Sequence, residues 1–278
     1  MSQVSWSTPD ISPDVPSVAR MYDYYLGGFH NFAVDRAAAE RALAIYPGLR
    51  LVMQANRAFL RRTVQFMIDQ GIDQFLDIGS GIPTAGNVHE IAQERNPLAT
   101  VVYVDVDPVA VAHSQAILRD QPRTASVLAD ARRPKDMVQM PEVRRLLDFD
   151  RPLGILGLML LHFIPEDALA FHIVHTLRDA MVPGSFLVLS HATSDQIPDD
   201  TKAQMVQLYA NTSNPIVARS SGVIATFFDG LELVAPGLVY LPQWRPEEPD
   251  DLLVDEPARS VTRGGVGQLK SNAEPQET

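Results

Sequence analysis

A carboxylate and two glycines form the part of this sequence whose spacing points most directly to chemistry. Asp77 lies within the apolar run 75–78, and the chain then continues Gly79, Ser80 and Gly81. A buried strand, a Gly-x-Gly turn and a following helix form the corner at which a Rossmann-type sheet binds a nucleotide. Glycines suit this turn because they adopt conformations closed to other residues and leave room for a ligand. The motif alone is weak, since glycines also end many ordinary strands.

A second carboxylate adds specificity. The β-branched run 99–104 predicts the next strand, and Asp105 stands at its end. An acidic residue about 20 positions beyond such glycines binds ribose, because a carboxylate accepts hydrogen bonds from both hydroxyl groups. Asp107 precedes Pro108 and is expected to be a helix N-cap. Asp105 is thus the ribose candidate, with Val106 beside it, and a nucleoside-containing ligand is predicted.

The loop after the glycines discriminates between nucleoside ligands. A dinucleotide site normally has a third glycine beside the pyrophosphate. Here the chain reads Ile82-Pro83, and the loop contains no Lys or Arg. Both features favour S-adenosylmethionine, which carries no phosphate. Asp77 is then expected to receive its ammonium group, directly or through water; alternatively, loop N–H groups satisfy this carboxylate.

The third strand, expected at 125–129, also ends in a carboxylate, Asp130, followed by Ala131. The Asp130 carboxylate can accept from an adenine amino group, and the Ala131 N–H can serve a ring nitrogen. Asp130 could equally cap the loop before Pro134. The candidate cofactor-binding residues are Tyr22, Gly28, Asp77, Gly79, Ser80, Gly81, Asp105, Val106, Asp130 and Ala131.

Repeated alternation of strands and helices predicts an α/β fold with a doubly wound, mostly parallel sheet. Further strands are expected at 153–161 and 185–190, with ligands at the carboxyl ends of the strands. The apolar runs 231–234 and 238–241 are joined by a link too short for a parallel crossover, which permits only an antiparallel pair. A parallel sheet ending in an antiparallel hairpin is typical of class I methyltransferases.

The segment 17–28 reads as a short amphipathic helix ended by paired glycines. It contains three of the chain's seven tyrosines, Tyr22 and Tyr25 among them. Such a helix can pack on the core with its tyrosine hydroxyl groups at the rim. Alternatively, it can form a lid over the ligand, with Gly27 and Gly28 as the hinge of the lid. The lid hypothesis places Tyr22 and Gly28 near the cofactor.

The expected domain organisation follows these patterns. It comprises a flexible arm at 1–16, a helical lid or cover at 17–71, a Rossmann-like cofactor-binding domain at 72–245 with an acceptor-side insertion at 192–230, and an acidic, proline-rich loop and tail at 246–278. Within the cover, helices are expected at 35–46 and 51–70.

Composition narrows the function class. The absence of cysteine excludes disulfides and thiolate metal sites, and the net charge of −11 argues against nonspecific nucleic-acid binding. No signal peptide or membrane span is evident, which predicts a cytoplasmic protein without membrane contact. No metal-ligand spacing is evident either, so no metal is expected.

With these residues in place, the chain resembles a bacterial family named S-adenosyl methyltransferase, many of whose members have no assigned acceptor. The resemblance covers about residues 16 to 245. It rests on the segments 16–28, 31–32, 35–39, 77–84, 87–90, 103–105, 107–108, 227–233 and 236–239. It implies a class I methyltransferase fold, S-adenosylmethionine binding and a role for the Tyr22–Gly28 segment near the cofactor. It implies no substrate.

Methyl transfer from a sulfonium is already activated, so the protein mainly aligns the reactants and excludes water. A base is needed only where the acceptor must lose a proton. His162, directly after the fourth strand, is the catalytic candidate, although a histidine there can simply bind a backbone carbonyl. Tyr22 and Tyr25 could also contact the sulfonium through their ring faces. The candidates on the substrate side are Tyr25, His30, His191, Tyr209 and Arg219, with Asn214 in the same insertion.

Three functions follow from the sequence. The first is a methyltransferase acting on a small-molecule O or N acceptor. The second is a sensor that binds S-adenosylmethionine without turnover, for which a plugged acceptor side is expected. The third, an NAD-dependent oxidoreductase, is disfavoured by Pro83 and by the expected hairpin.

Overall fold

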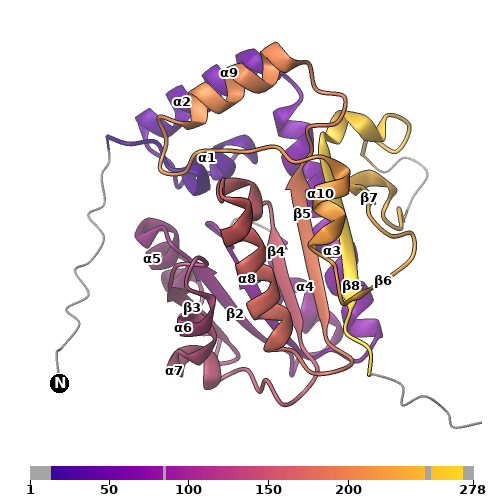
Figure 1. Cartoon of the computed structure of the whole chain (residues 1–278). Helices are drawn as coiled ribbons and strands as arrows, with labels where there is room; N and C mark the ends of the chain where they lie inside the picture. The colour runs from indigo at the N-terminus through magenta and orange to yellow at the C-terminus, as the bar shows by residue number, and fades with distance from the viewer. Residues whose placement is uncertain (1–13, 84–85, 248–251, 272–278) are drawn as a thin grey trace, which may run out of the picture.

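A single mixed sheet forms the centre of the molecule (Figure 1). The computed structural model describes residues 14–83, 86–247 and 252–271. Its strands are β1 (Gln74–Ile78), β2 (Thr100–Asp105), β3 (Thr124–Leu128), β4 (Gly154–Leu158), β5 (Phe186–Ala192), β6 (Glu232–Leu233), β7 (Val239–Tyr240) and β8 (Thr262–Gln268). The strand order is β3-β2-β1-β4-β5-β8-β6, and β7 also pairs with β8. Strands β1 to β5 are parallel, and the order reverses between β1 and β4, which is where such sheets bind ligands.

Helices cover both faces of this sheet. They are α1 (Val18–Tyr25), α2 (Ala33–Ile45), α3 (Leu49–Asp69), α4 (Val88–Arg95), α5 (Pro108–Ile117), α6 (Pro134–Gln139), α7 (Pro141–Arg144), α8 (Asp167–Asp179), α9 (Asp199–Tyr209) and α10 (Ser221–Thr226), with 3-10 turns η1 (Leu161–Phe163), η2 (Leu241–Gln243) and η3 (Pro257–Ser260). The sequence did not predict α6 and α7. In the described ranges no helix is both long and apolar enough to cross a bilayer.

Two hydrophobic cores lie against the two faces of the sheet. Leu76 and Ile78 of β1 face the core formed with α6, α7, α8 and α10, whereas Phe75 faces the core formed with α3 and α4. All of β1 is buried. This explains why Phe75, Leu76 and Ile78 are apolar on both faces, because a parallel strand covered on both sides has no solvent-exposed face.

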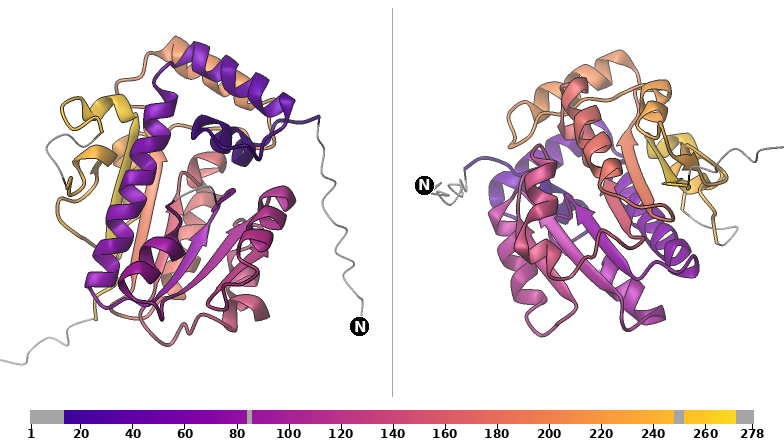
Figure 2. Two further views of the ribbon diagram at one scale, coloured as in Figure 1. Left: turned by 180° about the vertical axis from the view of Figure 1, so that it is seen from behind. Right: turned by 60° about the horizontal axis from the view of Figure 1, so that its bottom comes forward.

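A third core belongs to a helical cover above the carboxyl ends of the parallel strands (Figure 1). It joins Met21 of α1, Ala39 of α2, Val52 of α3 and Tyr209 of α9, so the cover is formed by the N-terminal helices together with a helix from the insertion. Helix α3 takes part in two cores. Its first half packs in the cover and its second half packs on the sheet, as the view from behind shows (Figure 2).

The expected hairpin of 231–234 with 238–241 is not the observed pairing. Glu232 and Leu233 pair with Gln268 and Gly267, and β7 pairs further along the same strand. Both short runs are antiparallel to β8, so together they form one interrupted edge strand. The antiparallel member of the mostly parallel sheet is β8, which pairs with β5 over its full length.

The residues of β8 fall in the segment that the sequence assigned to a loop and tail. Glycines conceal this strand from sequence reasoning because they carry no apolar side chain. They are required by close packing: a Cβ atom at Gly264 would lie 2.5 Å from Leu241 and 3.0 Å from Phe59 of α3, and one at Gly267 would lie 2.9 Å from Leu231. The glycines therefore let neighbouring side chains pack flush on the strand.

Candidate active site

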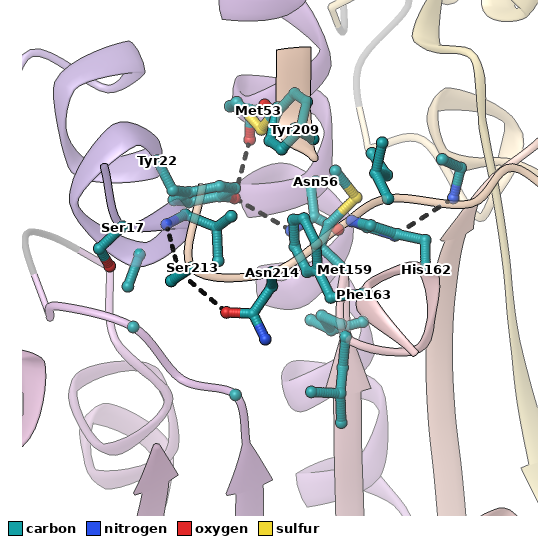
Figure 3. A pocket seen from close by; sticks show the side chains of 18 of the residues that line it. Ser17, Tyr22, Met53, Asn56, Met159, His162, Phe163, Tyr209, Ser213 and Asn214 are labelled. Carbon is teal, nitrogen blue, oxygen red and sulfur yellow. Dashed lines mark hydrogen bonds between the residues drawn. The ribbon is translucent and has the colours of Figure 1, made fainter. Parts of the chain in front are cut away.

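A cavity of about 550 Å³ lies between the carboxyl ends of the parallel strands and the helical cover (Figure 3). Its volume is in the range of small-molecule sites. Most of the sequence candidates line it: Tyr22, Tyr25, Asp77, Gly79, Ser80, Gly81, Asp105, Val106, Asp130, Ala131, His162, Tyr209 and Asn214. Gly28, His30, His191 and Arg219 are not among the described residues of the lining.

The glycine turn after β1 has the conformation that the motif requires. Gly79 and Gly81 have φ values of +71° and +65°, which residues with a Cβ adopt only at a cost. A Cβ at Gly79 would lie 2.8 Å from Leu160, whereas one at Gly81 would meet nothing within 4 Å. The first glycine is therefore needed for packing as well as for the turn, and the second leaves open space at the cavity wall.

Asp105 is held at the end of β2 by backbone groups. Its Oδ2 accepts from the Gly81 N–H at 2.7 Å and its Oδ1 from the Asp107 N–H at 2.8 Å. Burial raises the pKa of the Asp105 carboxyl to about 6, although these N–H groups oppose the shift. Each carboxylate oxygen still has a lone pair for a further hydrogen bond. The geometry can therefore serve both the turn and a ligand diol.

Asp77 lies beside Asp105 with its side chain at the cavity and is only 6% exposed. Burial raises the pKa of its carboxyl to about 7; the Arg57 charge opposes the shift and the Asp105 charge adds to it. Within the described part of the chain, no loop N–H donates to this carboxylate. A cationic ligand group would relieve the cost of burying this carboxylate.

Asp107 is the N-cap of α5, as predicted, and it also binds the cover. Its Oδ1 accepts from the Val109 N–H at 2.8 Å, and its Oδ2 accepts from the Ser17 hydroxyl group and from Arg20 at 3.4 Å. Arg20 in turn donates to the buried Asp35 at 2.7 Å. The first turn of α1 is therefore attached to the strand ends by a buried network of charged groups.

Asp130 has the loop role that the sequence left open. It accepts from the Arg132 N–H at 2.9 Å and forms an ion pair with the Arg132 guanidinium at 2.7 Å. This arrangement leaves Ala131 at the cavity, 9% exposed. Both residues remain within reach of a ligand that lies over the end of β3.

A chain of hydrogen bonds connects Tyr22 to the sheet, and Figure 3 shows its first link, from Asn56 to Tyr22. The Asn56 side-chain amide donates to the Tyr22 hydroxyl group at 3.0 Å, and its Oδ1 accepts from the Ser190 hydroxyl group at 2.7 Å. The Ser190 oxygen accepts from the N–H of Met159, a cavity residue with φ of +54°. A non-glycine residue in this region is uncommon and typical of functional sites. The sequence did not single out Asn56, although an amide within the apolar stripe of 51–70 is a signal.

His162 lies in η1 at the cavity and is almost completely buried. Burial, together with the neighbouring His191 and Arg219, lowers the pKa of its imidazole well below the usual value. The ring is therefore neutral at pH 7. Its Nδ1 lies 3.5 Å from the Ala192 N–H, at the long limit of a hydrogen bond, and the ring packs 4.3 Å from Phe163.

Gly28 and His30 lie on the outer side of α1, around Asp23. A Cβ at Gly28 would lie 2.0 Å from Asp23 Oδ1, so only glycine fits here. The His30 N–H donates to Asp23 Oδ2 at 2.9 Å, and the His30 ring packs 4.5 Å from His113 of α5. The structure therefore does not bring these two residues to the cavity: both lie against the buried Asp23.

His191 and Arg219 pack behind the cavity wall. Arg219 donates to the Leu161 carbonyl at 2.9 Å, to the Ile164 carbonyl at 2.8 Å and to His191 Nε2 at 2.9 Å, and it pairs with Asp167. Burial lowers the pKa of His191 to about 4. Neither residue lines the cavity; Arg219 and His191 instead hold the loop that presents His162.

Fold and site together define a class I methyltransferase. The parallel sheet reverses its strand order between β1 and β4 and includes one antiparallel strand, and acidic residues at the strand ends lie below a covered cavity. A crystal structure from Thermobifida fusca YX, provisionally described as a methyltransferase, shares 39% identity and a TM-score of 0.88 over 96% of this chain and all of its own. A DUF574 family protein from Streptomyces avermitilis MA-4680 shares 36% identity and a TM-score of 0.86, covering 93% of this chain and 99% of its own.

The family itself is shown by a family model described as S-adenosyl methyltransferase, which matches residues 4–270. The chain belongs to this family. It is accordingly an S-adenosylmethionine-dependent methyltransferase, and the resemblance noted in its sequence is confirmed. Among curated proteins none matches the chain.

Proposed function

We propose that this enzyme transfers the methyl group of S-adenosylmethionine to a small-molecule O or N acceptor held between the strand ends and the helical cover. The observation that carries the proposal is the extent of the cavity. It continues from the acidic strand ends to Tyr209 of α9, and is therefore long enough to hold a second molecule beside the cofactor. A sensor without turnover would need no such space.

In this proposal the strand ends bind adenosine. Asp105 binds the ribose hydroxyl groups with its remaining lone pairs, as the carboxylate after a second strand does in such folds. Asp130 and the Ala131 N–H bind the adenine edge, and Val106 contacts the adenine ring. The open wall at Gly81 supports this orientation, because ligand atoms can approach the backbone there without meeting a Cβ.

The amino-acid end of the cofactor would lie between Asp77 and Arg57. Asp77 pairs with the ammonium group, which would compensate for the burial of its carboxylate. Arg57 lines the cavity and is close enough to influence the Asp77 charge. It would receive the carboxylate group. Opposite charges at these two positions match the two charges of an amino acid.

When bound, the cofactor supplies a methyl group already activated on a positively charged sulfur. The cover, fixed through Ser17 and Arg20 to Asp107, would exclude water and align the acceptor. Tyr22, oriented by Asn56, would contact the sulfonium. His162 is the candidate to accept a proton; its neutral ring can do so, but its depressed pKa makes it a weak base.

Calorimetry on the full chain tests the proposal. We expect binding of S-adenosylmethionine and S-adenosylhomocysteine with one-to-one stoichiometry, and no binding of NAD. NAD binding with no response to either sulfur compound would reject the proposal in favour of an oxidoreductase. Release of S-adenosylhomocysteine in an acceptor screen would then exclude the sensor.

A further inference from the structure

We infer that the acceptor is a flat aromatic molecule that carries a hydroxyl group and an acidic substituent and has no positively charged group; this rests on the proposed function. The inference concerns the acceptor chamber, which we define as the part of the cavity lined by Met53, Met159, Phe163, Met205, Tyr209 and Ile216. These residues belong to one hydrophobic cluster beneath the cover.

An aromatic wall bounds this chamber (Figure 3). The rings of Phe163 and Tyr209 have centroids 6.1 Å apart at 39°, and the His162 ring lies 4.3 Å from Phe163. The Tyr209 hydroxyl group lies 3.4 Å from that of Tyr25, which extends the wall to α1. Ring contacts of this kind favour a flat aromatic guest over an aliphatic one.

Three methionines face the same space. Met53, Met159 and Met205 come from α3, the end of β4 and α9, respectively. Thioether side chains make favourable contacts with ring edges and adapt to the outline of their partner. The chamber is therefore suited to an aromatic ring system, with a tolerance for substituents that β-branched residues would not give.

The charge distribution selects against a cationic acceptor. Among the described residues that line the cavity, the carboxylates are Asp77, Asp105, Asp107 and Asp130. All four lie in or just after β1, β2 and β3, on the side assigned to the cofactor. The acceptor chamber contains none, although the chain has a net charge of −11. A buried ammonium group there would have no partner, which is strongly unfavourable.

Lys202 of α9 supplies a positive charge at the cavity wall. Its ammonium group pairs at 2.6 Å with Asp199, whose side chain is 97% exposed. Because Asp199 is so exposed, its ion pair with Lys202 contributes little to stability, and Lys202 can readily exchange this partner for another. Lys202 can therefore turn to an acidic group on the acceptor, whereas an uncharged acceptor would leave the existing pair intact.

The available bases indicate an aromatic hydroxyl group as the nucleophile. His162 is a weak base, and the chamber has no carboxylate. An aromatic hydroxyl group ionises near pH 10, far more readily than an alkyl alcohol, and can lose its proton to bulk water before the acceptor enters the covered chamber. An oxygen lone pair then forms the new C–O bond, and the electron pair of the broken S–C bond returns to sulfur.

Three matched probes test the inference on the full chain saturated with S-adenosylhomocysteine: 3-hydroxy-2-naphthoic acid, 2-naphthol and 3-(aminomethyl)-2-naphthol. They share one ring system and differ in charge. By calorimetry we expect the acid to bind at least about tenfold more tightly than the amine, with the naphthol between them. An amine that binds as tightly as the acid would overturn the inference, and so would a failure of all three to bind.

Two variants sharpen the test. Lys202→Met should weaken binding of the acid by about tenfold and leave the naphthol unchanged. Lys135→Met, on the exposed face of α6, is the matched control and should change neither. Met205→Asp should reverse the preference toward the amine. Affinity for S-adenosylhomocysteine should be unaltered in each variant, which shows that the fold and the cofactor side are intact.

The outcomes for the two proposals are distinct. If S-adenosylhomocysteine does not bind the unmodified chain, the proposed function fails. If it binds normally and Lys202→Met leaves the affinity for the acid unchanged, only the inference about the acceptor fails.

Discussion

The two halves of the cavity are built in different ways. On the side where we propose that the cofactor binds, the wall consists of backbone groups and short side chains at the ends of β1, β2 and β3, such as the Gly81 N–H and the Asp105 carboxylate. On the acceptor side, the wall consists of long apolar side chains from α3, α9 and η1. The first half depends on strand geometry, whereas the second depends on how separate helices pack. We therefore expect substitutions to alter cofactor affinity in the first half and stability or acceptor choice in the second.

The largest effect should come from the support of the acceptor side. Arg219→Ala removes a buried charge that binds the Leu161 and Ile164 carbonyls and His191. We expect the free energy of unfolding to fall by about 2–5 kcal/mol, because several buried acceptors lose their donor and each unsatisfied buried group costs about 1–3 kcal/mol. Chemical denaturation measures this. Arg119→Ala, at an exposed position, should change the free energy of unfolding by less than about 0.5 kcal/mol. If the two substitutions had equal effects, packing alone would hold the loop.

Asp105→Ala should instead act on the cofactor. Loss of a charged partner for ligand hydroxyl groups should weaken S-adenosylmethionine binding by about 1–3 kcal/mol in calorimetry. Asp120→Ala, on an exposed turn, provides the control. Unchanged affinity would remove Asp105 from the site and break the distinction between the two halves.

The pH dependence of the cofactor side should follow Asp77, whose pKa is about 7 in the folded protein. Because a cationic ligand requires the ionised form, affinity should fall by up to about tenfold between pH 8 and pH 6. Asp77→Asn should bind weakly at both pH values. A wild-type affinity that is flat across this range would contradict the assignment.

The same group gives an opposite effect on the stability of the ligand-free protein. Between pH 4 and pH 7 the folded chain holds a proton on Asp77 that the unfolded chain has lost, so this contribution falls as the pH rises. Asp77→Asn should therefore be more stable than the wild type at pH 8, and the two should converge toward pH 5. Thermal unfolding at the two pH values measures the difference.

The smallest effect compares two glycines of similar conformation. Gly81 and Gly71 both have positive φ, and a Cβ at either would meet nothing within 4 Å. Each substitution by alanine should cost about 1 kcal/mol of stability through backbone strain. Only Gly81→Ala should also weaken cofactor binding, since only Gly81 lines the cavity. Equal affinities in the two variants would show that the ligand does not approach this turn.

The sequence by itself determined the parallel sheet and most of the cofactor side. Strands β1, β2, β4 and β5 are largely short apolar runs, and Asp77 and Asp105 at the ends of β1 and β2 lie at the cavity because the carboxyl ends of parallel strands share one edge. The Gly79–Gly81 turn, the Asp107 N-cap and the position of Asp105 all depend on residues close together in the chain. Their positions could therefore be predicted from short segments of the sequence.

Only the tertiary structure decided the rest. Strand β8 is concealed by glycines that make room for Phe59 and Leu241, and the role of Arg219 depends on carbonyls more than 50 residues away. The acceptor chamber likewise joins α3 to α9, whose meeting no local pattern encodes. Side chains distant in sequence acquire their partners only through packing, so their chemistry cannot be read from spacing along the chain.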